Sequence, residues 1–182
     1  MLCQFSFSNF RSYRNETTLD FQAAALSEFR DSLIRTDKGA DLLPVIVVYG
    51  PNGGGKSNLL DALSCLLSLV TEPAFASGKA YSQFRLQKKV PCTPWLFDGD
   101  SSSEPTRFQL FFRMGEYEFR YYISLLRNEI LTESLYRRKL GASRAARFFE
   151  YMDGRLTLGQ PLAERNWRLP SPPECPGFPG FS

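Results

Sequence analysis

The feature that most constrains this chain is a glycine-rich run with the spacing GxxxxGK[ST], Gly50-Pro51-Asn52-Gly53-Gly54-Gly55-Lys56-Ser57. The preceding residues 42–49 are apolar and rich in β-branched side chains, which is typical of a strand buried on both faces. The following residues are apolar at positions 59, 63, 66, 67 and 70, a spacing that predicts a helix over residues 56–70. Strand, glycine loop and helix in this order predict an α/β fold with the loop at the start of the helix.

These residue types suit the binding of phosphate groups. Glycines let the backbone turn tightly, so that successive N–H groups face inward at the positive end of a helix. We expect Lys56 to reach the β- and γ-phosphates of a nucleotide and the Ser57 hydroxyl to ligate Mg²⁺. The predicted phosphate-binding residues are Gly50, Pro51, Asn52, Gly53, Gly54, Gly55, Lys56, Ser57 and Asn58.

Composition excludes several other classes of site. The chain has 182 residues, 43% of them hydrophobic and 23% charged, as in ordinary globular proteins, and a net charge of +3. It contains no histidine, which excludes a Ser-His-Asp triad and a His-based zinc site. No segment has the length of a membrane span, and the N-terminus does not resemble a signal peptide. The cysteines at 3, 65, 92 and 175 form no CxxC pair and are predicted to be free thiols in the cytoplasm.

The rest of the chain is predominantly β in pattern. Residues 1–24 alternate like a strand pair, with Cys3, Phe5, Phe7 and Asn9 on one side. Residues 23–38 are ambiguous between a loop and a short helix, and 71–104 are expected to be irregular with a short helix near 81–84. An antiparallel meander is then predicted, with strands at 107–113, 117–126, 130–139, 147–152 and 155–158.

The last segment differs in composition. Residues 170–182 contain five prolines and two glycines, which prevent a helix or an inner strand. We therefore expect one unit over residues 1–166 and an irregular tail over 167–182. Two interpretations stay open: a disordered tail, or a chain that ends prematurely, as a fragment or after a frame shift near Trp167.

The glycine loop and the N-terminal segment together resemble one group of ATPases. The form GxNGxGKS is similar to that of ABC and SMC-like ATPases, and Asn9-Phe10-Arg11-Ser12 resembles the start of RecF, SMC and OLD-type members. Residues 1–165 resemble the N-terminal lobe of a prokaryotic AAA/ABC-like ATPase of the abortive-infection kind. This resemblance implies a mixed α/β (α+β) fold, in which the P-loop strand and helix lie beside an antiparallel β-subdomain.

The resemblance also implies ligands and partners. It implies ATP and Mg²⁺ as ligands, with Arg11 and Ser12 near the nucleotide, although a solvated turn arginine explains Arg11 equally well. It further implies a homodimer of heads in the complete protein, acting on nucleic acid or on an effector protein in a defence or DNA-maintenance system.

Several parts of the family pattern are missing from this sequence. There is no Walker B strand that ends in Asp-Glu, since Trp95-Leu96-Phe97-Asp98 is followed by Gly99 in place of the catalytic acid. No LSGG-like signature and no switch histidine occur either. The sequence therefore assigns no catalytic residue and predicts nucleotide binding rather than turnover; the alternative is a truncated module that binds nucleotide without catalysis or is inert.

Other nucleotide-binding classes fit less well. The NKxD and DxxG motifs of GTPases are absent, and the meander does not match the parallel βα units of small-molecule kinases. A late basic cluster has two interpretations, a solvated sheet edge or a nucleic-acid-binding face. Its members are Arg127, Arg137, Arg138, Lys139, Arg144 and Arg147, with only Glu129 and Glu133 among them.

Overall fold

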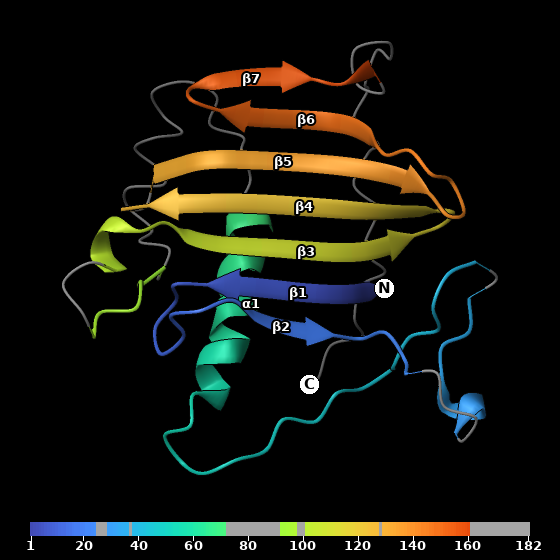
Figure 1. Ribbon diagram of the computed structural model, residues 1–182, viewed down its shortest axis with the longest axis horizontal. Helices are drawn as coiled ribbons and strands as arrows, with labels where there is room; N and C mark the ends of the chain where they lie inside the picture. The colour runs from blue at the N-terminus through green and yellow to red at the C-terminus, as the bar shows by residue number, and fades with distance from the viewer. Residues whose placement is uncertain (25–28, 37, 72–91, 98–100, 128, 161–182) are drawn as a thin grey trace, which may run out of the picture.

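A computed structural model describes residues 1–24, 29–36, 38–71, 92–97, 101–127 and 129–160. In this part of the chain seven strands form one antiparallel sheet, and a single α-helix, α1 (Lys56–Thr71), crosses behind it in Figure 1. The strand order is β2-β1-β3-β4-β5-β6-β7. The strands are β1 (Leu2–Ser8), β2 (Thr17–Asp20), β3 (Thr106–Met114), β4 (Tyr117–Leu126), β5 (Glu129–Lys139), β6 (Ala146–Met152) and β7 (Arg155–Leu158).

The N-terminal strand pair and the meander belong to the same sheet. The sequence predicts both groups of strands, and the structure confirms them, but no local pattern shows that they join. They join because β1 pairs with β3, with Phe7 opposite Phe108. Both rings are almost fully buried, so a one-residue slip in register would expose them.

The core lies between the sheet and α1, on what we call the inner face. Phe5, Phe7 and Phe108 lie in ring contact there, with centroids 5.4 Å apart for Phe5 and Phe7 and 6.4 Å for Phe5 and Phe108. Residues of α1 complete the cluster, among them Leu59, Ala62, Cys65, Leu66 and Leu69. The buried stripe of the helix therefore differs from the predicted one, since Leu67 and Val70 are about half exposed.

The strand predicted over residues 42–49 is not formed. Leu42 makes isolated bridges to Gln22 and Ile34, and residues 43–49 form no strand. Val47 is 76% exposed and Tyr49 is 90% exposed. A parallel strand needs neighbours for its N–H and C=O groups. The Leu43 N–H donates to the Phe21 carbonyl at 2.7 Å, and beyond Leu43 no described segment forms a ladder with this run. The expectation of a strand buried on both faces is therefore wrong for this structure.

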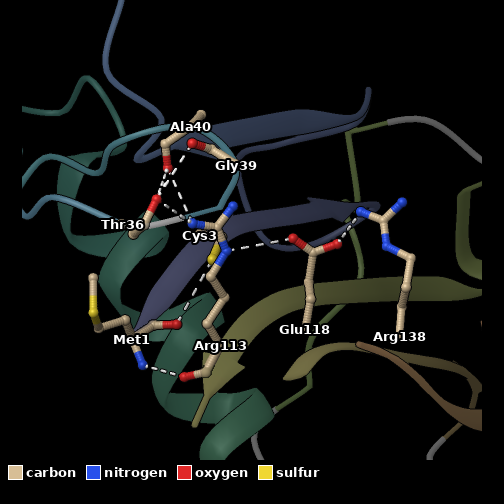
Figure 2. A network of polar contacts seen from close by, with 8 residues as sticks. All are labelled: Met1, Cys3, Thr36, Gly39, Ala40, Arg113, Glu118 and Arg138. Carbon is tan, nitrogen blue, oxygen red and sulfur yellow. Dashed lines mark hydrogen bonds and ion pairs between the residues drawn. The ribbon is translucent and has the colours of Figure 1, made fainter. Parts of the chain in front are cut away.

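A bulge near the N-terminus changes which side chain of β1 reaches the core. The register of β1 with β3 shifts between Leu2 and Gln4, so that Leu2 packs against the core cluster. Cys3 is buried beside Arg113 instead, although the alternation placed it with Phe5 (Figure 2). Burial raises the pKa of the Cys3 thiol, which keeps it protonated.

Arg113 connects the chain terminus, a loop and the sheet. Its carbonyl accepts a hydrogen bond from the Met1 amine at 2.7 Å, and its Nη1 donates to the carbonyl oxygen of Ala40 at 3.0 Å (Figure 2). Its Nε lies 3.5 Å from Glu118, which also pairs with Arg138 at 2.6 Å. These contacts hold Ala40 against the end of β3.

The remaining described segments are short. Among the described residues of the ambiguous region 23–38, a 3₁₀ turn, η1 (Arg30–Ser32), is formed, and a second such turn, η2 (Ser101–Ser103), precedes β3. The helix expected near 81–84 and the tail 167–182 lie outside the described residues. Cys3, Cys65 and Cys92 are free thiols, as predicted.

The late basic cluster does not lie on a sheet edge. β5, which carries Arg137, Arg138 and Lys139, lies between β4 and β6. Arg137 stacks over Phe148 and Tyr117, whereas Lys139 pairs with Glu116. The interpretation as a solvated edge is therefore wrong, because the edges are β2 and β7 and the cluster is divided between the two faces.

Candidate functional site

Residues 50–57, which we call the glycine loop, form a tight turn that leads directly into α1. Gly53 and Gly55 have left-handed backbones, with φ of 79° and 84°, a conformation that glycine adopts without steric cost. The Gly54 N–H donates to the carbonyl of Pro51 at 3.1 Å and closes the turn. The Lys56 Nζ donates to the carbonyls of Gly50 and Pro51, at 2.8 Å each, so its charge lies over the loop.

The loop ends at a helix N-terminus. α1 begins at Lys56 and has 16 residues, and no acidic residue lies in its first turn. The unpaired N–H groups and the helix dipole at such an end favour an anion. Ser57 is exposed beside this end, where its hydroxyl is accessible to a ligand.

The N-terminal segment 9–13 is anchored next to the glycine loop by Asn9. The buried Asn9 amide donates to the carbonyls of Ser101 and Glu104, at 2.9 and 2.8 Å, and accepts from the Trp95 N–H at 3.0 Å. Its carbonyl accepts from the Thr106 hydroxyl at 2.7 Å. Such a satisfied buried amide fixes the segment rigidly.

The next residues contact the loop and the first turns of α1. Ser12 Oγ accepts from the Asn58 amide at 2.9 Å, and the Tyr13 hydroxyl donates to the Gly55 carbonyl at 3.3 Å. Arg11 Nη1 lies 3.4 Å from Asn58 Oδ1 and pairs with Asp61. The structure therefore brings together the two sequence-predicted groups, residues 11–12 and 50–58, although they are about 40 residues apart.

Arg11 is held in an uncommon backbone conformation. Its φ is 47°, in the left-handed region, and its N–H donates to the Thr93 carbonyl at 2.9 Å. Non-glycine residues adopt this region only where surrounding contacts impose it. The side chain of Arg11 is 33% exposed and that of its partner Asp61 is 43% exposed. Exposed pairs of this kind contribute at most about 1 kcal/mol, so Arg11 can exchange Asp61 for another anion at little cost.

Two thiols lie behind this site. Cys65 of α1 donates a hydrogen bond to Cys92, which lowers the pKa of the Cys92 thiol. The same bond, together with burial, raises the pKa of Cys65.

Sequence reasoning missed three residues of this arrangement. Tyr13 and Asn9 flank the predicted Arg11 and Ser12 but were not assigned to the site. Asp61 was also missed. It could have been found from its position four residues after Ser57, because this spacing places both side chains on one side of the helix. All three act on the position of the predicted residues rather than on a ligand.

The residues that would complete a metal site are not evident. Within the described ranges, no group of three His, Cys, Asp or Glu side chains could hold a metal ion. Residues 95–97 form no strand, and Asp98 lies outside the described residues. The assignment of Ser57 as the Mg²⁺ ligand stays a prediction. Its hydroxyl is an oxygen ligand, which is the type that Mg²⁺ prefers.

Comparison with protein families places most of the chain in a known family. The model of the family described as "AAA domain, putative AbiEii toxin, Type IV TA system" matches residues 45–174, more than half of the chain. The matched region includes the glycine loop, α1 and the strands from β3 to β7. No curated protein gives a match. Among the helices that the structure describes, none has the length and apolar character needed to cross a membrane.

Proposed function

Because the chain belongs to this AAA domain family, which indicates a nucleotide-binding, ATPase-like function, we propose that the glycine loop binds Mg-ATP. Gly50 to Ser57 and Asn58 surround the phosphates, Lys56 pairs with the β- and γ-phosphates, and the Ser57 hydroxyl ligates Mg²⁺. Arg11 and Ser12 approach the same ligand from the N-terminal segment. The chain acts as the N-terminal lobe of an ABC/SMC-like ATPase in a cytoplasmic defence or DNA-maintenance system.

One observation carries this proposal: the anchored segment 9–13 touches the loop and α1 at Gly55, Asn58 and Asp61. Binding a triphosphate requires several cations and donors that converge on one point. Lys56 lies over the loop. Arg11 lies on the adjoining segment, and its partly exposed ion pair with Asp61 is weak. A chance glycine turn would not have a second cationic segment fixed against it.

The complete protein, in this proposal, holds ATP between two such heads and uses their closure to drive an effector or a nucleic acid. The alternative function is a non-catalytic nucleotide-binding or inert module. This alternative is favoured by the exposed side chains of Val45, Val47, Val48 and Tyr49 in a segment that forms no strand, because the strand before such a loop is normally fixed by its neighbours.

Calorimetric titration with Mg-ATP tests the proposal. Lys56→Ala should weaken binding by about tenfold to a hundredfold, since a charge-assisted hydrogen bond to phosphate is lost while the backbone of the loop persists. Lys139→Ala is the charge-matched control, because Lys139 pairs with Glu116 at the far end of β5 and should leave affinity unchanged. Equal affinities of the wild type and Lys56→Ala would overturn the proposal, and absence of binding to both would support the inert alternative.

A further inference from the structure

The sheet has a second face, opposite α1, that we call the outer face. Because residues opposite each other in antiparallel strands share a face, the register places four side chains in one row across four strands. Phe111 of β3 lies opposite Arg120 of β4, Arg120 opposite Tyr136 of β5, and Tyr136 opposite Arg147 of β6. The row alternates an aromatic ring with a guanidinium, whereas the neighbouring Phe112 and Tyr121 point to the core.

Contacts within the row order its side chains while leaving them at least partly exposed. The Arg120 guanidinium lies over the Tyr136 ring at 5.3 Å. The Tyr136 hydroxyl donates to Glu150 at 3.0 Å, and Arg147 donates to the other oxygen of Glu150 at 2.9 Å. Arg120 is exposed, and Phe111 and Tyr136 are partly exposed. Glu150 therefore fixes the ring and one arginine without covering them.

Two hollows lie along this face. One, of about 470 Å³, is lined by Phe111, Arg120, Tyr136 and Arg138 among others. The second, of about 430 Å³, is lined by Arg107, Tyr122, Thr132 and Met152 among others. Arg107 and Phe111 are four residues apart on β3, so the hollows are separated by about 13 Å along the strands.

The charge of the outer face is unbalanced. The register places six arginines of the strands on this face against four carboxylates. The arginines are Arg107, Arg113, Arg120, Arg138, Arg147 and Arg155, and the carboxylates are Asp20, Glu118, Glu129 and Glu150. Glu118 is shared by Arg113 and Arg138. An excess of arginine among aromatic rings favours a polyanion that also carries flat rings.

We propose that the outer face binds single-stranded nucleic acid. Bases stack on Phe111, Tyr122 and Tyr136 and on the Arg120 plane, and phosphates pair with the arginines around them. A duplex fits less well, because its bases are stacked on one another and present no free faces to the rings. The late basic cluster of the sequence contributes only Arg138 and Arg147 to this face, and Arg107 and Arg120 were missed.

The proposal is independent of the nucleotide site, since the glycine loop leads into α1 on the inner side. Fluorescence anisotropy of labelled oligo-dT and oligo-U of about 15 nucleotides tests it, at low and moderate salt. Arg120→Ala and Tyr136→Ala should each weaken binding by about fivefold to a hundredfold. Binding should also fall as salt rises, and an equal excess of duplex should compete poorly.

Controls separate this site from general attraction and from misfolding. Lys139→Ala removes one positive charge on the inner side and should leave affinity unchanged, as should Lys56→Ala. Arg120 is exposed, so Arg120→Lys keeps the fold and the charge but loses the stacking plane, and it should bind more weakly than the wild type. The proposal would be overturned if neither oligomer bound at low salt. It would also be overturned if Lys139→Ala and Arg120→Ala lost affinity equally, or if Arg120→Lys and Tyr136→Ala kept the affinity of the wild type. A self-association of the chain that Tyr136→Ala abolishes would overturn it too, because it would assign the face to a second copy.

Discussion

Gly53 and Gly55 have similar left-handed backbones, but only Gly55 is crowded. A Cβ on Gly55 would lie 2.8 Å from Ser12 Oγ and 3.4 Å from the Tyr13 hydroxyl, whereas a Cβ on Gly53 would meet nothing within 4 Å. Gly55 therefore serves two requirements, the turn of the loop and the close approach of the N-terminal segment. The motif spacing predicts the turn, but the approach of Ser12 depends on folding of residues far away in the sequence.

This difference predicts the behaviour of two variants. Gly53→Ala and Gly55→Ala should each lower the free energy of unfolding by about 1 kcal/mol, because alanine is strained in a left-handed backbone. Gly55→Ala should lower this free energy more than Gly53→Ala does, and it should also weaken Mg-ATP binding. The reason is that the added Cβ displaces Ser12 from its hydrogen bond with Asn58. Chemical unfolding and calorimetric titration of the two variants measure this. Equal effects of the two substitutions would show that the contact between the segments does not matter.

At the scale of elements, the hairpins of the meander and α1 could be predicted from the sequence, since their signals are local. Turns at Met114-Gly115-Glu116 and Asp153-Gly154 fix the strands on either side of them. Residues 42–49 show the limit of such reasoning, because an apolar run becomes a strand only when other strands pair with it. The pairing of β1 with β3 could not be predicted for the same reason, because the pairing of strands that are distant in the sequence leaves no local pattern.

Two leucines of α1 test how the helix is held against the sheet. Leu66 is fully buried in the core cluster, whereas Leu60 is 64% exposed. Leu66→Ala should lower the free energy of unfolding by about 2–5 kcal/mol, since it removes packed atoms and leaves a cavity. Leu60→Ala should change it by about 0.5 kcal/mol or less. Urea denaturation measures both, and a similar loss in the two variants would contradict the packing of α1 described above.

At the scale of the molecule, apolar surface is concentrated near the glycine loop. Val45, Val47, Val48 and Tyr49 are exposed in the segment before the loop, and Leu60 is exposed in the first turns of α1. Soluble monomers rarely expose contiguous surface of this kind. The site is thus bounded by an anchored segment on one side and by uncovered apolar side chains on the other.

This surface predicts association of the purified chain. Light scattering after size exclusion should show dimers or larger species whose fraction rises with concentration. Substitution of Val47 and Tyr49 by lysine should reduce it, because it adds charge to the exposed segment without disturbing the core. Met114→Lys, at an exposed residue in the β3–β4 hairpin, is the matched control and should have no effect. A monomer at every concentration would show that this segment is covered in solution.

The central claim is that the N-terminal segment 9–13 and the glycine loop form one Mg-ATP site. Hydrogen exchange with and without Mg-ATP, followed by mass spectrometry, tests it most directly, because it locates protection along the chain. Protection should increase in peptides that cover residues 9–14 and 50–61, should stay unchanged in β4 and β5, and should disappear in Lys56→Ala. The account would be contradicted if Mg-ATP protected only other segments. It would also be contradicted if exchange stayed unchanged in the peptides that cover residues 9–14 and 50–61.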